Sequence, residues 1–178
     1  MVPLIDLSRR MQANKEAFAL AVQQVMDSGN VLLGAQTTQF EKAFALFAGT
    51  QYGVAVSSGA AALQLSLAAL GIGEDDEVIV PAMTAVPTAS AVCAVGARPI
   101  IVDVDEETAA IDLDLVEAAM TERTRAVIAV HLYGRPVANL DRLMNLGVKV
   151  IEDCAQSHGA TRGLSGSIGA YSFYPTKS

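Results

Sequence analysis

Two charged residues near the end of the sequence are placed to serve one reaction. An apolar run at residues 148–151 stops at Glu152 and Asp153, and a second run at residues 170–174 is soon followed by Lys177. Ligands of α/β sheets bind beyond the carboxyl ends of the strands, so this spacing predicts Asp153 and Lys177 at one ligand site. A lysine that forms a Schiff base and a carboxylate that keeps a pyridine nitrogen protonated are what the chemistry of pyridoxal 5'-phosphate (PLP) requires.

The elements that must position these residues alternate along the chain. Short apolar runs predict strands at residues 53–56, 78–80, 99–104, 125–131 and 148–151. Periodic or continuous apolar segments predict helices at residues 8–27, 38–48, 60–70, 87–95, 112–120 and 137–146. This alternation indicates an α/β fold with a mostly parallel sheet covered by helices. We expect N-terminal helices in residues 1–50 and the α/β sheet core in residues 51–178.

Two segments carry signals for the ends of helices. The Ser-Gly-Asn sequence at residues 28–30 is expected to end the first helix, since glycine favours the backbone conformation that follows a helix. Thr38 and Glu41 have the spacing of a capping box, in which two side chains bond the free backbone N–H groups of a helix start. The second helix is therefore predicted to begin at Thr38.

The small-residue turn at residues 57–59 precedes a nearly all-apolar helix. The start of such a helix offers free N–H groups, which bind anions such as a phosphate. The alternative is an ordinary strand-to-helix turn that uses glycine for close packing, and this segment alone favours that alternative. The carboxylate and the lysine found later in the chain favour the anion site.

Composition and charge exclude several classes of protein. The 178 residues are 52% hydrophobic and 17% charged, which indicates a compact domain with a sizeable core. The net charge of −7 argues against a nucleic-acid-binding surface. The uncharged segments 43–73 and 78–97 contain prolines or polar turn residues, so we expect buried strand–helix units and not membrane spans. Two isolated cysteines and no secretory signal predict a cytoplasmic protein.

Six motifs in order give a specific resemblance. They are S-S-G-A-A-A-L at 57–63, D-E-V-I-V-P-A-M-T at 76–84, V-D-V-D at 102–105, H-L-Y-G-R-P at 131–136, E-D-C-A-Q-S-H-G at 152–159 and Y-S-F-Y-P-T-K at 171–177. The sequence from about Gly29 onward resembles the DegT/DnrJ/EryC1/StrS family of PLP-dependent nucleotide-sugar aminotransferases. The resemblance implies the large domain of a fold-type I PLP aminotransferase, with PLP as cofactor.

The resemblance also assigns roles to individual residues. Lys177 matches the lysine that bonds the cofactor and later moves a proton, and Asp153 matches the acid on the pyridine nitrogen. Gln156 matches a residue near the ring and its phenolic oxygen, and Ser172 matches a serine that contacts the cofactor phosphate. All four assignments follow the family pattern at the matching motif positions.

The same comparison of motifs assigns the phosphate turn and shows two departures. Gly59, Ala60 and Ala61 match the turn that holds the phosphate through backbone N–H groups. The family often has a hydroxyl residue where this chain has Ala60, so one hydroxyl contact is absent. Ala85 stands where an aromatic side chain commonly stacks on the cofactor ring, and alanine has no ring to stack.

Other residues with reactive side chains have weaker patterns around them. For His131 a structural role is expected, and for His158 either a substrate contact or a backbone hydrogen bond fits a loop position. Cys154 is expected to be a small buried residue, because no partner histidine has the spacing of a nucleophilic pair. The spacing of histidine, cysteine and carboxylate residues predicts no metal site.

The resemblance implies a reaction and its partners. An amino group would pass from an amino acid, expected to be glutamate, to a keto-sugar on a nucleotide, and the protein would form a homodimer or higher oligomer. The alternative is a non-catalytic or incomplete fragment with weak PLP binding, because the 178 residues end just after Lys177 and do not contain the family's C-terminal small domain. A dinucleotide-binding oxidoreductase is disfavoured, because the turn at 57–61 lacks G-x-G-x-x-G spacing.

Overall fold

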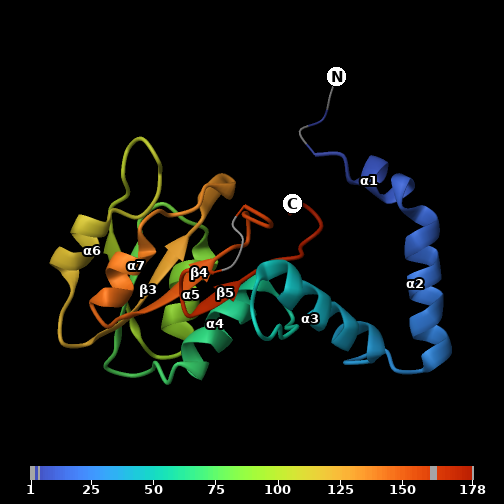
Figure 1. The fold of residues 1–178 in the computed structure, drawn as a ribbon, viewed down its shortest axis with the longest axis horizontal. Helices are drawn as coiled ribbons and strands as arrows, with labels where there is room; N and C mark the ends of the chain where they lie inside the picture. The colour runs from blue at the N-terminus through green and yellow to red at the C-terminus, as the bar shows by residue number, and fades with distance from the viewer. Residues whose placement is uncertain (1–2, 4, 161–163, 178) are drawn as a thin grey trace. The chain divides into compact units, whose positions relative to one another are not determined.

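The first of two compact units consists of helices. The structure, a computed structural model, describes residues 3, 5–160 and 164–177, and the chain divides into the units Met1–Ala55 and Val56–Ser178. The first unit holds α1 (Leu7–Ala13), α2 (Lys15–Ser28) and α3 (Ala35–Ala48) (Figure 1). The prediction of one helix over residues 8–27 is wrong, because the chain breaks at Asn14. The Asn14 side-chain amide donates to the Arg10 carbonyl at 3.0 Å, a local bond of the kind that competes with helix.

The start of α3 also differs from the expectation. The helix begins at Ala35, after an extended Gly34, and no side chain caps it. The capping box at Thr38 and Glu41 is therefore wrong. The Glu41 carboxylate instead accepts a hydrogen bond from the Ala55 backbone N–H at 2.8 Å, so it is not available to cap the helix start.

The predicted strand at residues 53–56 is not part of the sheet. The described residues 53–56 have no strand assignment. A Cβ built on Gly53 would lie 2.7 Å from the Glu41 carbonyl oxygen, so this segment packs against the backbone of α3 through a position that only glycine fits.

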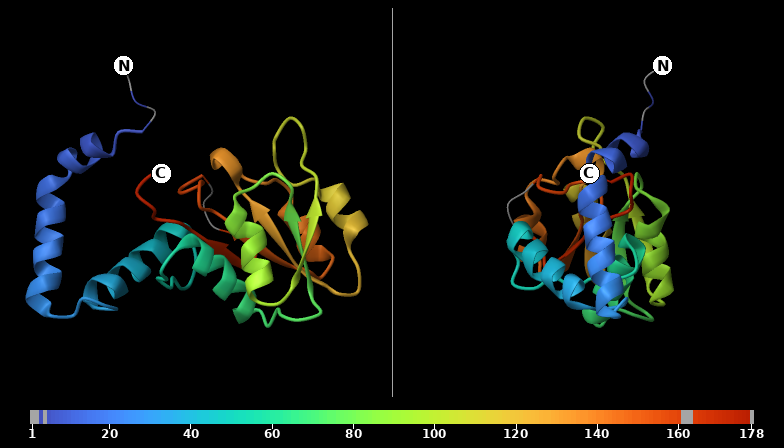
Figure 2. Two further views of the ribbon diagram at one scale, coloured as in Figure 1. Left: turned by 180° about the vertical axis from the view of Figure 1, so that it is seen from behind. Right: turned by 90° about the vertical axis from the view of Figure 1, so that its right-hand side faces the viewer.

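The second unit is built on a five-stranded parallel sheet. Its strands are β1 (Glu77–Pro81), β2 (Arg98–Val102), β3 (Thr124–Val130), β4 (Lys149–Asp153) and β5 (Ile168–Ala170), in the order β2-β1-β3-β4-β5. Every pairing is parallel. The connecting elements are α4 (Gly59–Ala69), α5 (Val86–Ala94), α6 (Leu113–Ala119), the 3₁₀ turn η1 (Leu132–Gly134) and α7 (Leu140–Asn145) (Figure 2). The expected α/β fold with a parallel sheet covered by helices is confirmed.

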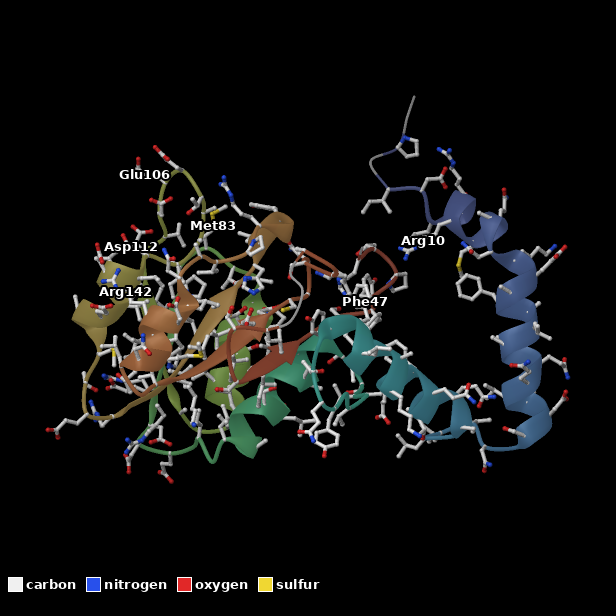
Figure 3. All side chains as sticks on the ribbon, in the orientation of Figure 1. Arg10, Phe47, Met83, Glu106, Asp112 and Arg142 are labelled. Carbon is white, nitrogen blue, oxygen red and sulfur yellow. The ribbon has the colours of Figure 1, made fainter. Side chains whose placement is uncertain are left out.

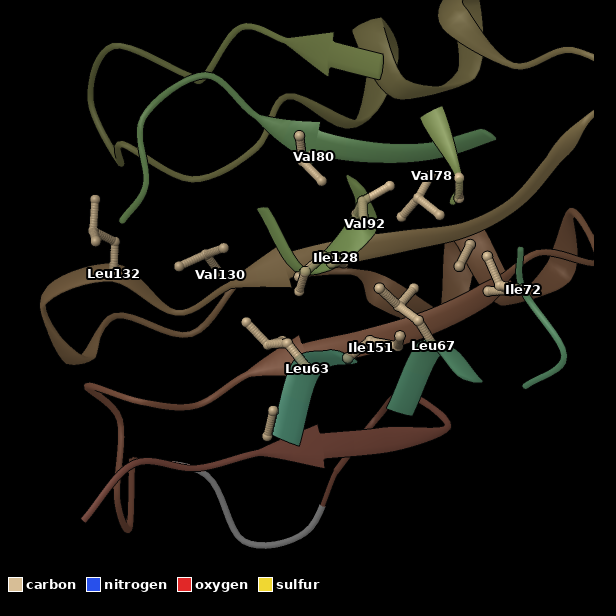
Figure 4. Packing of buried hydrophobic residues seen from close by; sticks show 14 residues of the cluster. Leu63, Leu67, Ile72, Val78, Val80, Val92, Ile128, Val130, Leu132 and Ile151 are labelled. Atoms are coloured by element: carbon tan, nitrogen blue, oxygen red, sulfur yellow. The ribbon is translucent and has the colours of Figure 1, made fainter. Parts of the chain in front are cut away.

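Each face of the sheet packs against its own pair of helices. On one face, Val78 and Ile128 join Leu63 and Leu67 of α4 and Val92 of α5 (Figure 4). On the opposite face, the alternate strand residues pack against α6 and α7. The buried side chains are Ile79, Val127 and Val150 of the strands, Val116 of α6, and Leu140 and Leu143 of α7. Because successive strand residues point to opposite faces, a sheet covered on both sides needs near-continuous apolar strands, and these sequences provide them.

An ion-pair group links α6 and α7 on the outer surface. Arg142 pairs with Asp114 at 2.6 Å and also with Glu117 (Figure 3). The nearby Asp112 carboxylate caps α6 by accepting a hydrogen bond from the Asp114 N–H at 2.8 Å. The helix α7 begins at Leu140 and not at residue 137 as predicted.

The late start of α7 has a local cause. The Val137 backbone N–H donates to the buried Nδ1 of His131 at 3.0 Å. Asn139 then takes a left-handed backbone conformation, with φ of 58°, directly before the helix. The segment from 137 to 139 is thus held to the end of β3 and does not continue the helix. Across the described part of the chain, the helices are too short or too polar to cross a membrane.

Candidate active site

The predicted carboxylate and lysine follow neighbouring strands. Asp153 is the last residue of β4 and pairs with Ala170, the last residue of β5. The strand β5 is shorter than the apolar run at residues 170–174, so the chain from Tyr171 onward is irregular. It then turns tightly, and the Lys177 N–H donates to the Tyr174 carbonyl at 2.8 Å. Both groups therefore lie beyond the carboxyl ends of adjacent parallel strands, where ligands of α/β sheets bind.

The segment after β5 lies against the start of α4. A Cβ built on Gly59 would lie 3.0 Å from the Ser172 Cβ and 3.5 Å from its Oγ. The Ser172 hydroxyl oxygen accepts from the Tyr174 N–H at 3.4 Å, and its proton is free to be donated. The structure thus brings together Gly59 and Ser172, two residues that lie far apart in the sequence and that the family pattern assigns to one phosphate.

The three N–H groups at the start of α4 are not equivalent. Ser58 is the N-cap, and its hydroxyl oxygen accepts from the Ala61 N–H at 3.1 Å. The N–H groups of Gly59 and Ala60 precede the first hydrogen bond within the helix, and they point out of its end. Of the three predicted phosphate donors, Gly59 and Ala60 are the two that the helix itself leaves open.

The Asp153 carboxylate is almost fully buried and has a donor on each oxygen. Oδ1 accepts from the Ala155 N–H at 3.1 Å, and Oδ2 accepts from the Thr88 hydroxyl at 3.3 Å. Burial raises the pKa of Asp153 above its ordinary value, although these two hydrogen bonds and the charge of Lys177 act in the opposite direction. Such a carboxylate is poised to accept a cationic N–H group, which would offset the cost of burying its charge.

His158 lies near Lys177 and packs against two aromatic residues of the segment after β5. The His158 ring lies edge-on to Tyr171, with ring centroids 5.5 Å apart, and to Phe173, at 5.2 Å. Burial lowers the pKa of His158, and the charge of Lys177 lowers it further, whereas the backbone of Ser172 opposes the shift. His158 is thus a packed neighbour of the lysine.

Gln156 is held by the turn that follows β3. Its Oε1 accepts from the Tyr133 N–H at 2.7 Å. A backbone N–H only donates, so this bond fixes the orientation of the amide and leaves the Nε2 group as a donor. A donor is what the predicted contact with a phenolic oxygen needs, and that contact stays a prediction.

His131, Glu152 and Cys154 form a buried group that the spacing did not predict. Their ligand atoms lie within 4.8 Å of one another, a grouping that their spacing in the sequence did not indicate. Burial raises the pKa of the Cys154 thiol to about 12, in agreement with a small buried residue. Figure 4 shows the apolar packing on the opposite face of β4.

The hydrogen bonds of this group argue against a metal. His131 Nδ1 accepts the Val137 N–H, so the proton of a neutral ring lies on Nε2, which faces Glu152 Oε2 at 2.7 Å. The nitrogen that faces the group is therefore a donor and has no lone pair for an ion. The expected structural role of His131 agrees with these two bonds.

Sequence reasoning missed two hydroxyl residues beside the predicted carboxylate. Thr88 lies within α5 and is fully buried, and its hydroxyl is 2.7 Å from that of Thr84. The available signal was the presence of two threonines, four residues apart, in the otherwise apolar segment that leads into α5. The sequence does not show that α5 packs near the end of β4, so this spacing alone could not identify Asp153 as the partner of Thr88.

Comparison with known proteins gives relatives of one kind. Residues 12–178 match the model of the DegT/DnrJ/EryC1/StrS aminotransferase family. The dTDP-3-amino-3,4,6-trideoxy-alpha-D-glucose transaminase of Micromonospora megalomicea subsp. nigra is 45% identical over 166 residues, 88% of this chain and 44% of the relative. The UDP-N-acetyl-3-dehydro-alpha-D-glucosamine 3-aminotransferase of Acidithiobacillus ferrooxidans is 42% identical, over 99% of this chain and 50% of the relative.

Solved structures agree with these relatives. DesV of Streptomyces venezuelae, in complex with a ketimine intermediate, superposes with a TM-score of 0.94 at 43% identity, over 99% of this chain and 50% of that one. An aminotransferase from Brucella abortus gives a TM-score of 0.92 at 33% identity, over 99% of this chain and 52% of that one. The chain thus spans about half the length of the relatives it matches. Since the family model covers nearly all of it, this chain belongs to the DegT/DnrJ/EryC1/StrS aminotransferase family.

Proposed function

We propose that this chain carries the cofactor site of a PLP-dependent aminotransferase that acts on a nucleotide-linked keto-sugar. The observation that carries the proposal is the meeting of two pairs of residues at one edge of the sheet. Asp153 and Lys177 follow the ends of β4 and β5, and Gly59 lies against Ser172 at the start of α4. An acid, a lysine and an anion-binding helix start are the groups that a PLP site requires.

The residues present fit a phosphorylated pyridine aldehyde. Gly59 and Ala60 offer N–H groups to the phosphate, and Gly59 leaves open a space next to Ser172 that a β-carbon would narrow. The Asp153 carboxylate would accept the pyridine N–H, and Gln156, whose Oε1 is bonded to the Tyr133 N–H, would offer an amide N–H to the phenolic oxygen. When bound, PLP supplies an electron sink for the carbon that loses or gains a proton.

Lys177 has two tasks in the proposal. Its amine bonds covalently to the cofactor and, once released, carries a proton from one carbon to the other. The Lys177 side chain is half-buried. Asp153 would keep its charge paired with the ring nitrogen.

The substrate, donor and assembly come from the relatives and the family pattern. The relatives' names describe a dTDP-sugar transaminase and a UDP-sugar aminotransferase, and we propose the same class of substrate here. We further propose glutamate as the amino donor, a homodimer or larger assembly, and a cytoplasmic location. The reduced state expected for the two free cysteines, one of them buried, supports that location.

The test is to find where PLP bonds to the protein. The chain is titrated with PLP while the absorbance is followed. The product is then reduced with borohydride, and the modified peptides are identified by mass spectrometry. We expect one pyridoxyl group, on Lys177, and none after Lys177→Arg. The exposed Lys42 and Lys149 are internal controls for non-specific reaction. Labelling of these surface lysines at the same level as Lys177 would contradict the proposal.

A second assay addresses the reaction. The loaded protein is mixed with glutamate or with other amino acids, and the transfer of the amino group to the cofactor is followed by absorbance. Nucleotide-linked keto-sugars are then added as acceptors and compared with the free keto-sugars. Faster transfer to a nucleotide-linked sugar than to the free sugar is expected. Equal rates would contradict the proposal that the substrate carries a nucleotide.

A further inference from the structure

We propose that Thr88, supported by Thr84, is a positioning residue that holds the Asp153 carboxylate ionised and turned toward the ligand nitrogen. This inference rests on the proposed function, since it assigns a role relative to the cofactor nitrogen. It concerns residues that none of the family motifs singles out as part of the site. Thr88 lies in the first turn of α5 and Thr84 lies two residues before that helix, and Thr88 bonds the carboxylate oxygen that the Ala155 N–H does not.

The geometry is a short chain of hydroxyl groups that ends on the acid. Thr84 Oγ1 and Thr88 Oγ1 are 2.7 Å apart, and Thr88 Oγ1 is 3.3 Å from Asp153 Oδ2. Thr88 is fully buried, so its hydroxyl has no water as an alternative partner. An O–H···O distance of 3.3 Å is long, and bonds of this kind in active sites often shorten when the ligand binds.

The direction of the protons follows from what each group can do. An ionised carboxylate only accepts, so the single hydroxyl proton of Thr88 points to Asp153. Thr84 must then donate to the oxygen of Thr88. Hydrogen bonds in such a chain polarise one another, so Thr84 strengthens the bond from Thr88 without contacting the acid.

Both oxygens of the acid then have a donor before any ligand arrives. Donors to the charged form favour ionisation, which opposes the effect of burial. One lone pair on each oxygen remains for the ligand, and the carboxylate is kept from rotating. A cation that approaches therefore meets an acceptor that is already charged and oriented.

Few other groups around Asp153 can change its proton affinity, so the effect of this hydroxyl chain can be tested separately. The helices α4 and α5, which pack on this face of the sheet, contain no acidic or basic side chain. The titratable groups that act on Asp153 are Lys177 and His131. Neither is changed by a substitution in α5, so an effect of Thr88 variants is separable from theirs.

The test measures the proton affinity of Asp153 in the chain without cofactor. Aspartate labelled with ¹³C at the carboxyl is introduced, and its NMR signals are followed against pH, with Asp153→Asn identifying the signal. We expect Thr88→Val to raise the pKa of Asp153 by about one unit, a tenfold gain in proton affinity. Thr88→Ser should restore the value, and Thr84→Val should give a smaller rise.

The control and the outcomes keep the inference separate from the proposed function. Ser66→Ala removes another hydroxyl, bonded to the Ala62 carbonyl at 2.7 Å within α4, and should leave Asp153 unchanged. An Asp153 pKa that Thr88→Val does not move, or that Ser66→Ala moves equally, would overturn the inference. If Thr88→Val does not fold, Thr88→Ser and Thr84→Val decide alone. Added PLP should bind about tenfold more weakly to Thr88→Val, and failure of PLP to bind the parent chain would refute the function instead.

Discussion

Gly59, at the start of α4, and Ser172, two residues beyond β5, are in direct contact across more than a hundred residues of chain. A β-carbon on Gly59 would lie 3.0 Å from the Ser172 Cβ, closer than carbon atoms normally approach. The glycine therefore avoids a tight contact with Ser172. The contact holds the helix start and the serine hydroxyl side by side, as one anion would need them.

Gly59→Ala should weaken cofactor binding more than it weakens the fold. The added methyl group pushes Ser172 away by a few tenths of an ångström, and we expect a stability loss of ~1 kcal/mol. The PLP dissociation constant should rise about tenfold, because the phosphate loses part of its contact set. Titration by absorbance and urea unfolding measure the two effects.

The matched control is Gly73→Ala. A Cβ on Gly73 would meet the Val95 carbonyl oxygen at 3.5 Å, an ordinary contact, and this glycine has no positive φ. It should leave PLP affinity unchanged. Equal effects of the two substitutions on PLP affinity would show that the space at Gly59 has no special role in binding.

Asp153→Asn should stabilise the cofactor-free chain at neutral pH. Burial raises the pKa of Asp153 in the folded state above its ordinary 3.8. A raised carboxyl pKa means that folding favours the protonated form, so the parent's stability falls as pH rises from 3.8 through the folded-state value. The asparagine variant lacks this loss, so the difference in unfolding free energy between the two should grow over that window and then level off. Urea unfolding from pH 3 to 8 measures it.

The same substitution should impair the amino-group transfer. Asparagine keeps the shape but cannot hold the ring nitrogen protonated, so the electron sink weakens. A charge-assisted hydrogen bond contributes about 1.5–3 kcal/mol, which predicts a rate loss of roughly 10- to 100-fold with PLP still bound. An undiminished rate of the half-reaction would mean that Asp153 has only a structural role at the end of β4.

Glu152→Gln should destabilise the fold without removing the cofactor site. The two carboxylate oxygens accept from the His131 Nε2–H and from the Gly166 N–H, so an amide in their place sets its own NH₂ against a donor. We expect a loss of about 1.5–3 kcal/mol in urea unfolding. Glu117→Gln, which removes a surface partner of Arg142, is the control and should cost much less.

The pH dependence of the Glu152 variant has the opposite sign to that of Asp153→Asn. Burial opposes ionisation, but the bonds from His131 and Gly166 prevail and lower the pKa of Glu152 below its ordinary 4.5. Its stabilising contribution is therefore complete above pH 4.5 and is lost as pH falls through the lower folded-state value. The gap between parent and Glu152→Gln should accordingly close in acid. A gap that is constant down to low pH would contradict the assigned hydrogen bonds.

The sheet and its helices were predictable because their signals are local. Apolar runs of the right length predicted β1 to β4 within one or two residues, and the alternation with helices predicted a mostly parallel sheet. The starts of two helices were predicted wrongly, because a bond to a residue outside the helix decides each outcome. Glu41 bonds Ala55 and not its own helix start, and Val137 bonds His131 and not the first turn of α7.

The site was predictable to the same extent. The residues beyond the ends of β4 and β5 could be named, because topology fixes where such residues lie. The contact between Gly59 and Ser172 and the hydroxyl bond of Thr88 depend on the packing of α4 and α5 on the sheet. No pattern within a single segment carries that information.

The two neighbouring acids at the end of β4 have a consequence for how this chain tolerates insertions. Glu152 bonds His131 on the α7 side of the sheet, whereas Asp153 bonds Thr88 on the α5 side, because adjacent strand residues face opposite ways. A shift of the strand by one residue would turn each carboxylate to the other face of the sheet, away from its present partner. One residue gained or lost in the loop before Lys149, where it shifts the strand, would therefore act as a double mutation at this edge of the sheet, while the apolar strand itself still looked intact.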